Sequence, residues 1–184
     1  GGLFMADFDL GTYRRDITTT SDTAKEHFDT GLNWLFGFNH EAAAKAFEKA
    51  VAADPECGLA WWGIAYAIGP NYNTPWEFFE PDERVATLER AQEAIAAAQK
   101  LSRKLAPVEN ALIDALADRF PTDPEVEDYG PWNDAFADNM RKVHAEYGND
   151  LDVVSLFAEA LMNRTPWLLW DLETGAPAEG ASTL

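Results

Sequence analysis

The fold is decided by AKEHFDTGLNWLFGFNHEAAAKAFEKAVAADPEC, residues 24–57. Its first half carries apolar residues at i, i+4, i+7 and i+8, the spacing of one face of an α-helix. A second helical pattern follows the short sequence Gly37-Phe38-Asn39. Pro55 ends that pattern, because proline has no N–H to donate and disfavours helix at the residue before it. The stretch therefore predicts an antiparallel helical hairpin, which needs stacked neighbours to bury its apolar faces.

Small and aromatic residues occupy fixed positions in this stretch. Gly31 and Ala43 remove bulk where two helices must approach closely, and Phe47 fills the space between them. With Trp34 and Pro55, they resemble the tetratricopeptide repeat (TPR) pattern, W-x2-L-G-x2-Y…A-x3-F…P. Three positions depart from that pattern: His27, Thr30 and His40. The resemblance implies an all-α superhelix of stacked antiparallel hairpins.

The repeat period continues into residues 57–68, CGLAWWGIAYAI, which we expect to form the next helix. Proline- and glycine-rich loops then separate further helical patterns. Helices are expected over residues 82–104, 107–120, 131–147 and 151–163, which gives about seven helices in all. Three parts follow: an extended leader packed on the helices (1–20), a TPR-like domain (21–170) and a flexible linker (171–184).

Three segments carry a resemblance that covers nearly the whole chain. They are GFNHEAAAKAFEKAVAADPEC, AWWGIAYAIGPNYN and FAEALMNRTPW. They look like the N-terminal part of longer bacterial TPR proteins of largely unassigned function. The resemblance implies a fold and no reaction, and it implies that further repeats follow. We therefore also expect association through the C-terminal end.

The composition restricts the class of partner. The chain has 14 basic and 32 acidic residues and a net charge of −18, which argues against nucleic acid or an anionic membrane. A cationic peptide or a metal cation is compatible with that charge, as is an acidic surface that only aids solubility. Cys57 is the only cysteine, so no intrachain disulfide can form. Without a signal peptide or membrane-spanning pattern, the expected location is cytoplasmic.

The first helix of each hairpin should line the inner surface of a TPR superhelix. That surface is expected to be apolar and aromatic, and therefore to need a cover: the leader, further repeats, a partner or a small molecule. The expected side chains are Phe28, Leu32, Leu35 and Phe36 from one helix and Leu59, Trp62 and Tyr66 from the next.

The loop GPNYNTPW, residues 69–76, is longer than a turn requires, and such loops are often functional. Its aromatic rings and amides could form a pocket with the turn of the preceding hairpin. The alternative is that the asparagines only hold the backbone of the loop. The candidate binding residues are Asn39, His40, Trp62, Tyr66, Asn71, Tyr72, Asn73 and Trp76.

No nucleophile, phosphate-loop or metal-protease motif is present in the sequence, and we predict no catalytic residue, metal or cofactor. The leading hypothesis is a protein-interaction module that binds a peptide or partner segment on its inner surface. One alternative is a small-molecule or metal site completed by further repeats, with His40 as ligand or general base. Another is an inert scaffold whose groove is filled by residues 1–20.

Overall fold

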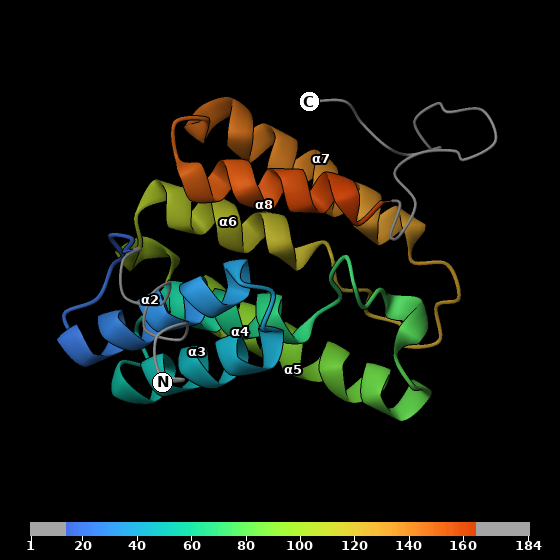
Figure 1. Cartoon of the computed structure of the whole chain (residues 1–184), viewed down its shortest axis with the longest axis horizontal. Coiled ribbons are helices and arrows are strands. Elements are labelled where there is room, and N and C mark those ends of the chain that lie inside the picture. Colours follow the sequence, from blue (N-terminus) through green and yellow to red (C-terminus); the bar gives the residue numbers. More distant parts are fainter. Residues whose placement is uncertain (1–13, 165–184) are drawn as a thin grey trace, which may run out of the picture. The chain divides into compact units, whose positions relative to one another are not determined.

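A computed structural model describes residues 14–164. This part of the chain is all-helical with no β-strand, which confirms the predicted fold class and about seven helices (Figure 1). Residues 1–13 of the predicted leader, and residues 165–184 with the predicted linker, lie outside the described residues. The elements are α2 (Asp22–Phe36), α3 (His40–Ala53), α4 (Gly58–Ile68), η1 (Trp76–Phe78), α5 (Pro81–Gln99), η2 (Ser102–Lys104), α6 (Pro107–Ala117), α7 (Gly130–Tyr147) and α8 (Leu151–Met162).

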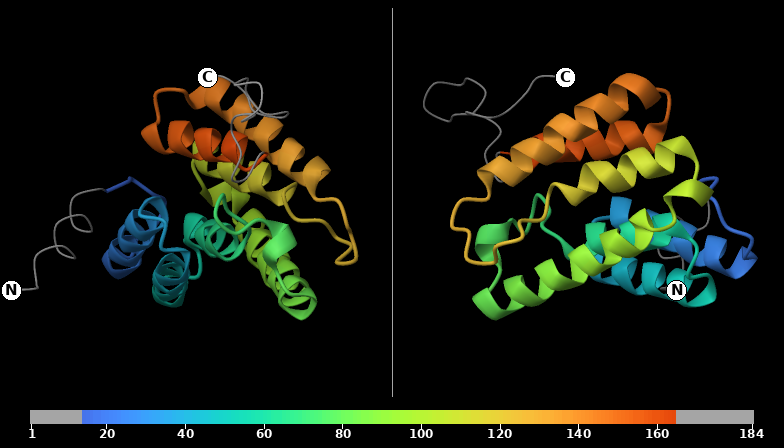
Figure 2. Two further views of the ribbon diagram at one scale, coloured as in Figure 1. Left: turned by 45° about the vertical axis from the view of Figure 1, so that its right-hand side comes forward. Right: turned by 180° about the vertical axis from the view of Figure 1, so that it is seen from behind.

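The chain divides into two compact units. In the described part, the first comprises residues 14–69 and 90–113, and the second comprises residues 70–89 and 114–164. Within the first unit, α3 packs against both α2 and α4, and these three helices lie side by side (Figure 2). Within the second unit, α7 packs against α8. Superhelical stacking of hairpins remains a prediction.

The turn between α2 and α3 is built from backbone hydrogen bonds. Phe38 N–H donates to Leu35 O at 3.1 Å, and Asn39 N–H donates to Trp34 O at 2.9 Å, which is a Schellman closure of α2. Phe38 therefore adopts a left-handed conformation with φ of 61°. The Asn39 side chain caps α3 by accepting from Ala42 N–H at 3.1 Å. These bonds close the predicted hairpin.

Phe47 of α3 is completely buried between two glycines of the neighbouring helices. A Cβ placed on Gly31 of α2 would lie 2.7 Å from its ring, and one on Gly63 of α4 would lie 2.6 Å from it. Phe28 of α2 also contacts this ring, with centroids 5.5 Å apart. The three helices can approach this closely only because both glycines lack side chains. The predicted role of Gly31 and Phe47 matches this packing, whereas Gly63 is not among the predicted packing residues.

The core of the second unit is built around Trp76, which is 1% exposed. Its indole stacks on Tyr129 with centroids 5.3 Å apart and meets Phe120 edge-on at 6.1 Å. An aromatic cluster thus joins the long loop after α4 to the segment that precedes α7.

In the same unit, the side chain of Asp150 caps the start of α8 by accepting from the N–H groups of Asp152 and Val153.

Two predicted helices end earlier than the sequence pattern indicated. The segment expected as 82–104 is helical to Gln99, and the segment expected as 107–120 is helical to Ala117. In both places an i→i+3 bond tightens the last turn: Leu101 N–H donates to Ala98 O, and Arg119 N–H donates to Leu116 O. Apolar spacing continues through such turns, so the periodic pattern overruns the helix end.

We expect Gly63→Ala to lower the free energy of unfolding by about 1–3 kcal/mol. Alanine normally favours a helix over glycine by about 1 kcal/mol, but the added methyl meets a ring that Gly31 confines on its other side. Urea denaturation followed by circular dichroism measures the change. Phe47→Leu in the same background should recover part of the loss. Additive effects of the two substitutions would contradict this packing.

Candidate functional site

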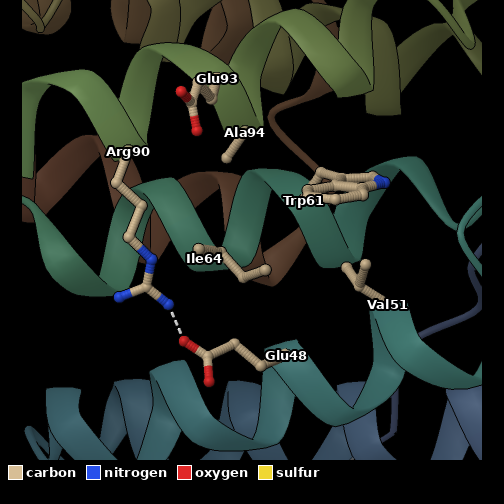
Figure 3. Close-up of a pocket in the computed structure, with 7 residues that line it drawn as sticks. All are labelled: Glu48, Val51, Trp61, Ile64, Arg90, Glu93 and Ala94. Carbon is tan, nitrogen blue, oxygen red and sulfur yellow. Dashed lines mark ion pairs between the residues drawn. The ribbon is translucent and has the colours of Figure 1, made fainter.

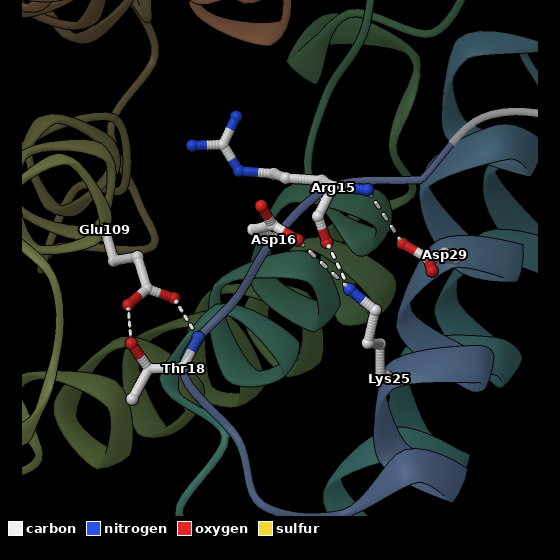
Figure 4. Close-up of polar contacts among 6 residues, drawn as sticks. All are labelled: Arg15, Asp16, Thr18, Lys25, Asp29 and Glu109. Carbon is white, nitrogen blue, oxygen red and sulfur yellow. Dashed lines mark hydrogen bonds and ion pairs between the residues drawn. The ribbon is translucent and has the colours of Figure 1, made fainter.

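The segment 14–20 runs extended along the first unit and is held by polar contacts (Figure 4). Arg15 N–H donates to Asp29 Oδ1 of α2 at 3.1 Å. Lys25 Nζ donates to Arg15 O at 3.3 Å and forms an ion pair with Asp16 at 3.5 Å. Both backbone groups of Arg15 are therefore bonded to side chains of α2.

Farther along the same segment, Thr18 contacts Glu109 in the first turn of α6. Thr18 N–H donates to Glu109 Oε2 at 3.0 Å, and the Thr18 hydroxyl donates to Glu109 Oε1. The same carboxylate accepts from Ala106 N–H at 2.9 Å, as in a helix capping box. Glu109 is only 2% exposed, so these donors replace the water that its charge would otherwise need.

A third contact joins the Thr19 hydroxyl to Asp54, which ends α3. The extended segment is thus bound by carboxylates from three places in the first unit. Arg15, Ile17, Thr18 and Thr19 are half-buried, and Asp16 and Thr20 are exposed. Polar contacts, rather than an apolar anchor sealed from solvent, hold this segment in place.

The surroundings of Asp29 shift the pKa of its carboxyl group. Burial raises its pKa above the ordinary 3.8, and the hydrogen bond from Arg15 and the charges of Lys25 and Arg14 partly oppose that shift. The side chain is 6% exposed. Its ionised form is therefore less favourable in the folded chain than in water.

Four of the predicted binding residues belong to the first unit. Asn39 is the helix cap described above, and His40, the first residue of α3, is half-buried. Trp62 and Tyr66 are buried at 3% and 1% exposure, with ring centroids 5.2 Å apart. The other residues expected on the inner surface are also buried, apart from the half-buried Phe36: Phe28, Leu32, Leu35 and Leu59. These buried rings are core, not an open aromatic surface.

The other four predicted residues belong to the second unit. Asn71 Oδ1 accepts from Asn73 N–H at 2.9 Å and from Thr74 N–H at 3.1 Å, so this side chain holds the backbone of its own loop. That is the alternative the sequence left open. Tyr72 is half-buried and Asn73 is exposed, whereas Trp76 is in the core. The first four predicted residues are thus described within the first unit, and the other four are described within the second unit.

A cleft that the sequence analysis missed lies between α3, α4 and the residues of α5 that belong to the first unit (Figure 3). Its volume is about 270 Å³. We call it the Trp61 cleft, and it is lined by Glu48, Val51, Trp61, Ile64, Arg90, Glu93 and Ala94. The sequence contains one signal for this cleft. Trp61 and Trp62 are adjacent in one helix, so their side chains point in different directions and cannot both face the same side of it.

Other kinds of site find less support in the described residues. Between positions 14 and 164, no three potential metal-ligating side chains gather at one point. Burial raises the pKa of the Cys57 thiol to about 11, so its thiolate is scarce at neutral pH. The helices in residues 14–164 are too short or too polar to cross a membrane.

Comparison with known proteins adds no relative: no protein-family model, curated protein or solved structure matches the chain. The resemblance to TPR proteins therefore remains a prediction. The two features of this chain that bear on function are the bound segment 14–20 and the Trp61 cleft.

We expect Asp29→Asn to raise the free energy of unfolding at neutral pH. The amide oxygen can still accept from Arg15 N–H, while the cost of burying a charge is removed. Because the folded-state pKa is raised, wild-type stability falls as pH rises from the ordinary value of 3.8 through the folded value. The gain should therefore shrink as pH falls through that window.

Urea denaturation at a series of pH values measures this difference. Asp29→Ala is the matched control, because it removes the charge and also the acceptor for Arg15 N–H. It should be less stable than Asp29→Asn at every pH. A stability difference between wild type and Asp29→Asn that does not change with pH would contradict the assignment.

Proposed function

We propose that this chain is a protein-interaction module that binds an extended peptide segment without catalysis. The observation that carries the proposal is the segment 14–20, which the first unit already holds in an extended conformation. Its anchors are the carboxylates of Asp29, Asp54 and Glu109. The mode of binding thus differs from the predicted one, in which Trp62, Tyr66 and Tyr72 are among the binding residues.

The contacts define the chemistry of a suitable segment. Two of them are made by backbone N–H groups, which any residue except proline can supply. Selectivity comes from hydroxyl groups at positions equivalent to Thr18 and Thr19, each donating to a carboxylate. Hydrogen bonds to a charged group are stronger than neutral ones. With a net charge of −18, the chain favours a partner segment that carries basic residues, as Arg14 and Arg15 do here.

The segment 14–20 would then compete with any partner for the same surface. A tethered segment is present at a high effective concentration, so a free peptide binds only weakly while the tethered one is in place. The tethered segment is only partly buried and is held through a few polar contacts. Weakening one of those contacts should open the surface to a peptide added in solution.

We expect Thr18→Ala to raise the affinity of the full-length chain for a fluorescent peptide of the sequence RRDITTTS, residues 14–21. The substitution removes one hydrogen bond to a charged group, worth about 1.5–3 kcal/mol, and so weakens only the tethered competitor. We expect at least a tenfold gain, about 1.4 kcal/mol, measured by fluorescence anisotropy.

Thr20→Ala is the matched control, because Thr20 is exposed and its replacement should leave the affinity unchanged. A scrambled peptide of the same composition tests the sequence dependence. Hydrogen exchange shows whether Thr18→Ala releases the amides of residues 15–19. Release of these amides without binding of the added peptide would overturn the proposed function.

A further inference from the structure

We propose that the Trp61 cleft binds an alkylammonium group, carried either by a small amine or by a lysine side chain. This inference is independent of the segment 14–20, because none of the residues that line the cleft contacts that segment through a hydrogen bond or ion pair described above. It depends on three properties of the cleft: a fixed indole ring, an excess of negative charge and a small volume.

The indole of Trp61 is held by one edge. Its Nε1–H donates to Pro55 O at 2.9 Å, and the side chain is half-buried. In Figure 3 the ring lies between Ala94 above it and Val51 below it. Indole is the aromatic side chain that attracts cations most strongly, and a cation over its face gains most where water is partly excluded. The methylene groups of an alkyl chain could contact Val51 and Ile64.

The charges in the cleft favour a cation. Arg90 reaches across from α5 and forms an ion pair with Glu48 of α3, as Figure 3 shows, so these two charges largely cancel. Glu93 also lines the cleft and lies one helical turn from Arg90. Its exposed carboxylate is the remaining charge in the lining. An anion would be repelled by Glu93 and would have to separate Arg90 from Glu48. An ammonium group would be attracted to Glu93 and would leave that ion pair in place.

The size of the cleft limits the ligand. A volume of about 270 Å³ is just below the usual range for drug-sized ligands, about 300–1,000 Å³. A four-carbon amine or the end of a lysine side chain is small enough for this volume, and it offers an ammonium group to Glu93 and methylene groups to the apolar residues. Larger ring systems do not match this volume.

The test uses the full-length chain labelled with ¹⁵N and titrated with n-butylammonium chloride. The indole Nε1–H signal of Trp61, assigned through Trp61→Phe, should shift and saturate in the millimolar range at low salt. Butan-1-ol, which has the same carbon chain without the charge, should not saturate the signal. Nα-acetyl-lysine amide and Nα-acetyl-norleucine amide make the same comparison for a side chain. Saturation by butylammonium alone would identify a small amine as the ligand, and saturation by the lysine compound would identify a side chain.

Two substitutions should change the affinity in opposite directions. Glu93→Gln removes the remaining charge and should weaken binding about fivefold, whereas Arg90→Gln frees Glu48 and should strengthen it by a similar factor. Glu83→Gln and Arg103→Gln, on exposed residues outside the cleft, are the matched charge controls and should have little effect. The proposal is overturned if butylammonium causes no saturable shift, if butanol binds equally, or if the cleft variants behave like the controls.

Discussion

The first unit depends on one steric constraint, the confinement of Phe47 between two glycines. Gly31 and Gly63 belong to helices on either side of α3, and neither has room for a methyl group next to the ring. This arrangement brings α2, α3 and α4 close together and buries the apolar residues around them. The three helices then present the ends and side chains that the extended segment and the Trp61 cleft require.

Carboxylates have particular structural roles in this acidic chain. Glu109 is buried, yet it accepts from two backbone N–H groups and one hydroxyl, so its charge is fully engaged. Asp29 accepts from one backbone N–H, and burial raises its pKa. Glu48 pairs with Arg90 across the Trp61 cleft. A high acidic content therefore includes side chains that organise the fold as well as side chains that only meet solvent.

Local patterns predicted the helices well and their long-range partners poorly. The hairpin turn and the packing of Phe47 against Gly31 follow from nearby residues, so the sequence could indicate them. The contact between Thr18 and Glu109 joins residues 91 positions apart, and no periodic pattern encodes it. Among the tryptophans, helical spacing cannot say which is core: Trp62 is buried, while its neighbour Trp61 faces a cleft.

The bonds around Arg15 have a consequence for proteolysis. Arg14 and Arg15 are basic residues, and trypsin-like enzymes cleave after such residues. Such an enzyme must place the carbonyl of the scissile bond in its oxyanion hole, but the Arg15 carbonyl accepts from Lys25 and the Arg15 N–H donates to Asp29. Cleavage after Arg15 therefore requires the segment to leave the helices first. Resistance to trypsin at this bond therefore measures how firmly the first unit holds the segment 14–20.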